Sequence, residues 1–104
     1  MRILVVSDTH GDLRSLIKAV DAQRKAEIIV HCGDGEEQQR FLKDNYKDKM
    51  IVAVRGNCDW NSFFPSKEIF KVCGKTIFVT HGHLYDAKSG LYRITSAARE
   101  AGAD

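Results

Sequence analysis

Three short apolar runs organise the first half of the chain. They are Ile3-Leu4-Val5-Val6, Ile28-Ile29-Val30 and Ile51-Val52-Ala53-Val54, and polar or glycine-containing segments flank them. Runs of this kind predict strands that are buried on both faces, as in a parallel sheet that is covered by helices. We therefore expect strands over residues 2–7, 27–32 and 50–55.

Helical patterns separate these strands. Between the first two, apolar residues recur with helical spacing at Leu13, Leu16, Ile17 and Val20. Asp12 precedes them and has the side chain of a good N-cap, so we expect a helix from about 13 to 25. The polar stretch 36–44 predicts a second helix. This alternation of strand and helix implies right-handed crossovers and a parallel sheet.

The pattern changes in the second half of the chain. Two β-rich runs at residues 68–73 and 76–81 are separated by Gly74-Lys75, which predicts a hairpin turn between antiparallel strands. Tyr92 to Ala101 has a helical pattern, and Gly102 is a suitable C-terminal stop. The predicted fold class is thus α/β, with a mostly parallel sheet followed by a β-hairpin.

Length and composition narrow the class of protein. The chain has 104 residues, so we expect a single domain over 1–104. Its net charge of +2 is too small to indicate a specific nucleic-acid partner, and its apolar runs are far shorter than the roughly 20 residues of a membrane span. Three cysteines without CxxC spacing, and no export signal, favour the reducing cytoplasm.

Several apolar residues have a simple structural interpretation. We expect Cys32 and Cys73 to be small buried apolar groups. We interpret Trp60, Phe63 and Phe64 as core or interface residues rather than as groups that stack on a substrate.

Polar residues that can bind metals follow four of the apolar runs. They are Asp8 and His10 after the first strand, Asp34 after the second, Asn57 after the third and His81 after the last. Ligands bind at the carboxyl ends of the strands in an open α/β sheet, so we expect these side chains to converge on one site. A mixed set of oxygen and imidazole donors suits Mn²⁺, Fe²⁺, Zn²⁺ or Ni²⁺.

Four motifs in register resemble one known family. S-D-T-H-G-D (7–12), G-D-G (33–35), G-N-C-D (56–59) and T-H-G-H (80–83) resemble the motifs of the calcineurin-like metallophosphoesterases, and most closely those of the small YfcE-type phosphodiesterases. The resemblance implies an αββα sandwich built around a site for two metal ions. This chain would then be an N-terminal portion of that sandwich.

The resemblance also implies a ligand set. Asp8 and His10 would bind the first metal, Asp34 would bridge the two, and Asn57 and His81 would bind the second. Asp34 and Asn57 are also the expected catalytic residues, because Asn57 can approach the substrate phosphate. The expected cofactors are two divalent ions, Mn²⁺ first, with Ni²⁺, Fe²⁺, Zn²⁺ or Mg²⁺ as alternatives. Water activated by the two metals would hydrolyse a phosphodiester.

Two departures from the family pattern affect this expectation. Many relatives carry His where this chain has Cys58, although the YfcE-type branch has Cys there. The family also completes its site with a G-H-x-H motif on a later strand, which this chain lacks. We therefore expect the chain to be the front portion of a larger domain, with weak metal binding and little or no turnover on its own.

Simpler interpretations remain beside these. Asp34 lies between two glycines and could be only a turn residue. Asp59 is expected to orient a neighbour through hydrogen bonds, and Cys58 to be a site neighbour that is not a nucleophile. His83 could reach the site or substrate, or lie in a solvated loop. His31 is expected to be a packed residue in the core or behind the ligands.

The resemblance implies two possible functions. The first is a metal-dependent phosphoesterase that acts on a small phosphodiester, with no membrane partner. The alternative is a non-catalytic, protein-binding scaffold on the same fold, which the retromer scaffold subunit of eukaryotes exemplifies. Unpaired sheet edges would also favour a homo-oligomer.

Overall fold

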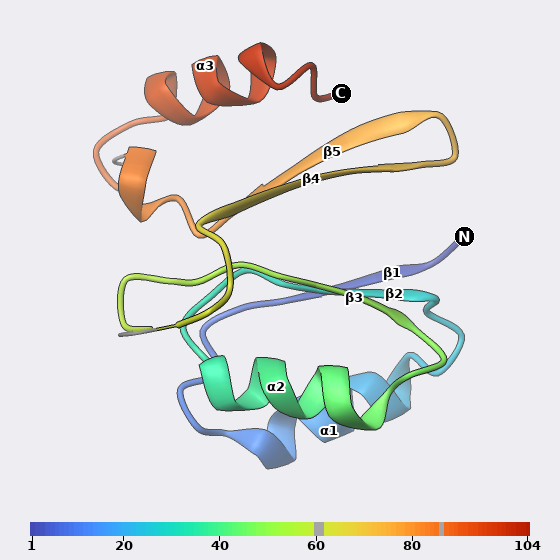
Figure 1. Cartoon of the computed structure of the whole chain (residues 1–104). Helices are drawn as coiled ribbons and strands as arrows, with labels where there is room; N and C mark the ends of the chain where they lie inside the picture. Colours follow the sequence, from blue (N-terminus) through green and yellow to red (C-terminus); the bar gives the residue numbers. More distant parts are fainter. Residues whose placement is uncertain (60–61, 86) are drawn as a thin grey trace.

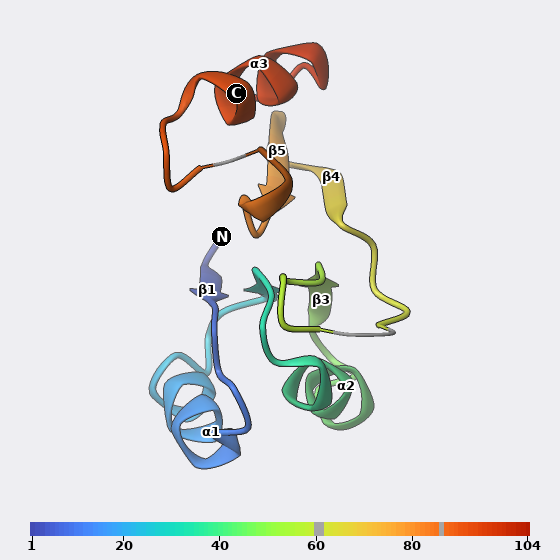
Figure 2. The same ribbon diagram turned by 90° about the vertical axis from the view of Figure 1, so that its left-hand side faces the viewer.

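The computed structural model describes residues 1–59, 62–85 and 87–104, and it consists of four layers (Figures 1 and 2). Helices α1 (Leu13–Ala22) and α2 (Glu36–Asn45) lie under the first sheet, and a two-stranded sheet and α3 (Tyr92–Glu100) lie above it. The predicted α/β class and the αββα layering are confirmed. Among the described residues, no helix is long and apolar enough to cross a bilayer.

The first sheet is parallel, as the sequence pattern predicts. Its strands are β1 (Ile3–Val6), β2 (Ile28–His31) and β3 (Met50–Ala53), in the order β1-β2-β3. All four residues of the central strand β2 are buried, because one face of the sheet meets the helices and the other meets the second sheet. Because all three strands are parallel, their carboxyl ends lie at the same edge of the sheet.

Two hydrophobic clusters hold the layers together. Alternate residues of β2 point to opposite faces, so Ile29 packs below with Leu16, Val20 and Leu42 of the helices. Ile28 and Val30 pack above with Val79 of the second sheet. The expected helix after β1 ends at Ala22, three residues early, because residues 23–25 form a turn into the buried Ala26. Asp12 caps its start, accepting from the Ser15 N–H at 3.1 Å.

The second sheet is the predicted hairpin of β4 (Lys67–Val72) and β5 (Lys75–Thr80). The turn residues are Cys73 and Gly74, not Gly74 and Lys75, because Val72 pairs with Lys75. Cys73 (φ 50°) and Gly74 (φ 78°) both have left-handed backbone, which is the conformation of a type I′ turn. Cys73 is therefore exposed, and the expectation that it is buried is wrong.

The residues after α3 bind to the edge of the second sheet. Gly102 (φ 72°) stops α3: its N–H donates to the Arg99 carbonyl, and the Ala103 N–H donates to the Ala98 carbonyl. The Asp104 N–H then donates to the carbonyl of Thr76 at the edge of β5.

A groove of about 750 Å³ opens between the two sheets, with Val5, Ile77 and Ile94 among its apolar walls.

Two aromatic residues before β4, Phe63 and Phe64, do not join the core. Trp60 lies outside the described residues. Phe63 is 91% exposed, so of its two expected roles only the interface role remains. Phe64 is half-buried on α2, where the Lys43 ammonium lies 5.0 Å from the centre of its ring.

We predict that Cys73→Asn stabilises the chain by about 0.5–1 kcal/mol, because Asn tolerates left-handed backbone better than Cys and Asn-Gly is the preferred type I′ pair. Urea unfolding followed by circular dichroism measures this difference. A variant that unfolds at lower urea than the native chain would contradict the assigned turn.

Candidate metal centre

The loops that follow β1, β2 and β3 meet at one edge of the parallel sheet. The Asp8 N–H donates to the Gly33 carbonyl at 2.8 Å, and the His10 N–H donates to the Asp34 carbonyl at 3.0 Å, so backbone hydrogen bonds join the first two loops. The Cys58 N–H donates to the Asp34 carboxylate Oδ1 at 2.8 Å, which adds the third loop.

Three of the expected ligands have strained backbone. Asp8 (φ 56°), His10 (φ 41°) and Asp34 (φ 61°) all adopt the left-handed region, which residues other than glycine seldom occupy. Such strain costs about 1–3 kcal/mol per residue and is concentrated at functional sites. The strained residues here are thus three of the residues that the sequence predicts as metal ligands.

Two glycines let the loops approach this closely. A Cβ on Gly56 would lie 2.0 Å from Asp34 Oδ1, and a Cβ on Gly33 would lie 2.8 Å from the Gly56 nitrogen and 2.9 Å from His81 Cδ2. Any side chain at either position would push the second loop away from the third. The G-D-G and G-N-C-D motifs therefore contain glycine for close packing.

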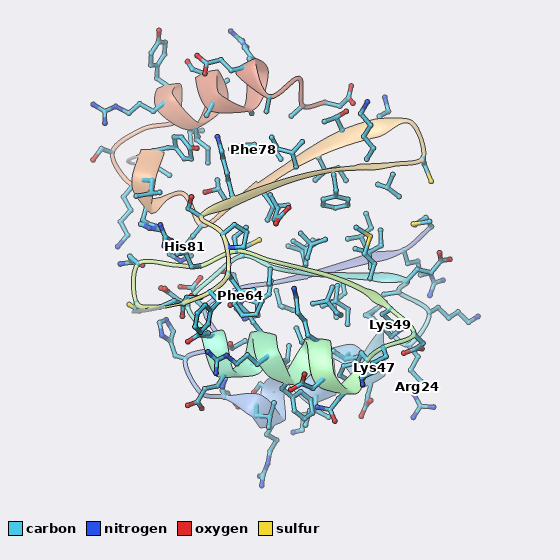
Figure 3. All side chains as sticks on the ribbon, viewed as in Figure 1. Arg24, Lys47, Lys49, Phe64, Phe78 and His81 are labelled. Atoms are coloured by element: carbon cyan, nitrogen blue, oxygen red, sulfur yellow. The ribbon has the colours of Figure 1, made fainter. Side chains whose placement is uncertain are left out.

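Four of the five expected ligands point their donor atoms at one another. His81 lies after β5, and Figure 3 shows its ring beside the loops of the lower sheet. Its Nε2 is 3.3 Å from Asp8 Oδ1 and 3.3 Å from Asp34 Oδ2. The His10 Nε2 is 3.6 Å from Asp8 Oδ1 and 3.8 Å from Asp34 Oδ2. Ligands that lie about 2.1 Å from a shared ion have separations of this size.

The donor atoms form two overlapping groups. Asp8, Asp34 and His81 make one, and His10, Asp34 and Cys58 make the other, with all ligand atoms of a group within 4.8 Å of one another. Asp34 belongs to both groups and is only 4% exposed. A buried carboxylate shared by two groups is what a bridging ligand requires.

The donor atoms also bring Cys58 into the cluster, which the expected ligand sets did not include. Asp8 Oδ1 lies 3.6 Å from Nε2 of His10, its expected partner, and 3.3 Å from Nε2 of His81, so it can share an ion with either imidazole. Asn57 is exposed in the third loop, and its roles as ligand and catalytic residue stay predictions.

The pKa values of three side chains in and beside the cluster are shifted by their surroundings. A hydrogen bond from the Ser7 hydroxyl lowers the pKa of Asp8, with a further contribution from His81. Desolvation and the nearby Asp34 carboxylate raise the pKa of the Cys58 thiol. Burial lowers the pKa of His83, whose ring packs on that of His81 with 5.4 Å between ring centres. His83 is thus half-buried beside a candidate ligand rather than solvated.

Asp59 fixes the second and third loops to each other. Its Oδ2 accepts from the N–H groups of Asp34 at 2.8 Å and Gly56 at 2.7 Å, and its Oδ1 accepts from Gly35 at 3.0 Å and Glu36 at 3.2 Å. Gly35 is the N-cap of α2 and has no side chain, so Asp59 caps this helix from a distant part of the chain.

His31 supports the first loop from below. It is fully buried, and its Nδ1 accepts from the Gly33 N–H at 3.1 Å and the Gln39 amide at 2.9 Å. Its Nε2 must therefore carry the proton, which it donates to the Thr9 hydroxyl at 3.0 Å. The Thr9 hydroxyl in turn donates to Oε1, the side-chain amide oxygen of Gln38, at 3.0 Å. The chain of donors and acceptors is consistent only with a neutral His31.

Thr9, Gln38 and Gln39 belong to this network although their sequence pattern did not predict it. Residues 36–44 are mostly charged, which is typical of a solvated helix, yet both glutamines are buried. The only signal was two adjacent amides in an otherwise charged segment, three and four residues after Gly35, which is the spacing of one helix face.

Comparison with known proteins identifies the family. The sequence profile of the calcineurin-like phosphoesterase superfamily domain matches residues 1–104. The chain belongs to this superfamily. It is 33% identical over 108 residues to the probable metallophosphoesterase YsnB of Bacillus subtilis strain 168, and the match covers the whole chain but 60% of YsnB. The chain thus spans about three fifths of the length of that relative.

Solved structures agree with this family. A conserved, uncharacterised Streptococcus pneumoniae TIGR4 protein, described as a predicted phosphoesterase, is 28% identical with a TM-score of 0.80, over 97% of this chain and 56% of its own. The Escherichia coli phosphoesterase YfcE (24% identity, TM-score 0.63, 85% of this chain and 61% of its own) shares the fold. Vacuolar Protein Sorting 29 of Cryptosporidium parvum also shares the fold, with 16% identity and a TM-score of 0.77 over 98% of this chain and 60% of its own.

We predict that Asp59→Asn lowers the free energy of unfolding by about 2–4 kcal/mol, because an amide nitrogen replaces one of two oxygens that accept from backbone N–H groups. The matched control is Asp12→Asn, which replaces an exposed helix cap and is expected to cost less than about 0.5 kcal/mol. Chemical denaturation measures both, and equal losses would mean that Asp59 does not fix the loops.

We predict that His31 titrates below the ordinary histidine value of about 6.5, because burial lowers its pKa. The unfolded chain then binds the proton more readily than the folded chain, so stability falls as pH drops through about 6.5 and recovers at higher pH. Ring nitrogen shifts in NMR report the midpoint and the protonated Nε2. A midpoint at or above 6.5 would contradict the buried network.

Proposed function

We propose that this protein is a metal-dependent phosphoesterase that hydrolyses small phosphodiesters. The observation that carries the proposal is the buried Asp34 carboxylate, which two groups of metal-binding side chains share. The membership of the calcineurin-like phosphoesterase superfamily supports the same activity. The chain spans only part of the length of its relatives, so the activity of a whole protein that contains it is also proposed here.

The residues present fit two divalent cations. The His81 Nε2 faces one oxygen of Asp8 and one oxygen of Asp34, each 3.3 Å away, and an imidazole nitrogen between two carboxylates can exchange its proton for a cation. Asp8, Asp34 and His81 would hold one ion, His10 and Asp34 the other, and Asn57 would add a neutral oxygen. Mn²⁺ is the proposed metal, since carboxylate and imidazole donors suit it. Bound cations would supply positive charge to the phosphate and acidify water.

The chain's own groups determine how a substrate would sit. The hydrogen bond from the Cys58 N–H holds Asp34 Oδ1, so that Oδ2 is the oxygen presented to both imidazoles. His10 is half exposed and lines a cavity of about 420 Å³ together with Gly11, Cys58 and Asp59. A phosphodiester would enter from this side, and its phosphate oxygens would face the Asp34 side of the cavity.

A protein-binding scaffold is the second candidate. The apolar groove between the two sheets, in which Val5 is 61% exposed, is the observation that favours it. The same exposed surface supports the proposed homo-oligomer. A scaffold would keep its binding function when Asp34 is replaced, whereas a phosphoesterase would lose its activity. The cytoplasm is the proposed location, in keeping with three free cysteines.

We predict that a form extended beyond Asp104 to a G-H-x-H motif hydrolyses bis-p-nitrophenyl phosphate with Mn²⁺, and that the 104-residue chain alone shows little or no turnover. Asp34→Ala in the extended form is expected to reduce the rate by at least about 100-fold, because both ions lose a ligand. Asp48→Asn, which alters an exposed carboxylate in the turn before β3, is the control.

Release of p-nitrophenol at constant pH measures these rates. An extended form that is folded and binds Mn²⁺, yet releases no p-nitrophenol, would overturn the proposed activity. Equal rates for Asp34→Ala and the native form would also do so.

A further inference from the structure

The two halves of the ligand cluster differ in chemical character. One half, Asp8 with Asp34 and His81, offers only carboxylate oxygens and imidazole nitrogen. The other half combines His10 and Asp34 with the sulfur of Cys58. Carboxylates suit manganese and magnesium, whereas a thiolate is a soft ligand that prefers zinc-class cations. The asymmetry rests on one side chain.

Cys58 is held in place by the backbone on both sides. It lies inside a turn in which the Asp59 N–H donates to the Gly56 carbonyl at 3.3 Å, and the Gly56 N–H donates to the Asp59 carboxylate at 2.7 Å. Its own N–H binds Asp34 Oδ1 at 2.8 Å. The thiol therefore stays beside Asp34.

The thiol is also accessible to an ion. The Cys58 side chain is exposed and lines the same cavity as His10 and Asp34. The other two cysteines lie elsewhere: Cys32 packs against the core above the sheet, and Cys73 occupies the hairpin turn between β4 and β5. Cys58 is thus the cysteine that shares a cavity with candidate metal ligands.

We propose that Cys58 is a metal ligand and makes the centre asymmetric, with a thiophilic cation on the His10 side and a manganese-class cation on the His81 side. This inference rests on the proposed metal centre. The cation on the His10 side would be bound by the Cys58 thiolate, the His10 imidazole and the Asp34 carboxylate, and binding would release the thiol proton to solvent.

Cobalt spectroscopy on the 104-residue chain tests this proposal, because Co²⁺ reports its ligands without any turnover. We expect visible d–d absorption and, in the near ultraviolet, a sulfur-to-cobalt charge-transfer band. Cys58→Ser is expected to lose the charge-transfer band and keep the d–d absorption. Cys73→Ser, the matched control, is expected to keep both.

Competition for the site gives a second readout. Removing a supporting group from a metal site commonly costs 10–100-fold in affinity, so Cys58→Ser is expected to bind Cd²⁺ at least about tenfold more weakly. Its affinity for Mn²⁺ is expected to change by less than about threefold, because Mn²⁺ gains little from sulfur. Titration calorimetry measures both affinities.

The outcomes separate this inference from the proposed function. Cobalt that binds with d–d absorption but without a sulfur band would overturn the role of Cys58 and leave the metal centre standing. No cobalt binding would overturn both. A sulfur band that persists in Cys58→Ser and disappears in Cys73→Ser would also overturn the assignment.

Discussion

The carboxylate of Asp59 is the group on which the site depends. It accepts hydrogen bonds from four backbone N–H groups, two of them at Asp34 and Gly56 in different loops. Hydrogen bonds to a charged acceptor are worth about 1.5–3 kcal/mol each, so this side chain can offset the strain of the left-handed backbone at Asp34. Asp34 returns the contact by accepting from the Cys58 N–H. Each carboxylate thus accepts a hydrogen bond from the loop that carries the other, and together they hold the second and third loops at a fixed distance.

The layered fold explains why these loops meet at all. Parallel strands place their carboxyl ends at one edge, and β2, buried on both faces, fixes the depth of Asp34. His31, the last residue of β2, points away from the upper sheet and ties the first loop to α2 through Thr9 and the glutamines. The second sheet then brings His81 over the same edge. The two sheets thus contribute the two sides of the cluster.

Much of the fold could be predicted because its signals are local. The buried runs identify β1 to β3, and Asp12 and Gly102 mark helix ends by their side chain and backbone preferences. Asp34 and His81 could be proposed as ligands because motif order implies convergence. The hairpin turn was expected one residue late, because Gly74 belongs to both candidate turn pairs, Cys73-Gly74 and Gly74-Lys75. The burial of Gln38 and Gln39 and the proximity of His10 to Cys58 depend on contacts between distant segments. Those contacts form only when the loops pack, and the two adjacent amides are the one local sign of them.

The most direct test of the central claim, that Asp34 lies between two cations, is anomalous X-ray scattering from crystals of the chain soaked in Mn²⁺. The account predicts two anomalous peaks about 3.5–4 Å apart, one on each side of the Asp34 carboxylate. Asp8 and His81 should lie beside one peak and His10 beside the other. Ordered side chains with no peak within ligand distance of Asp34 would contradict it.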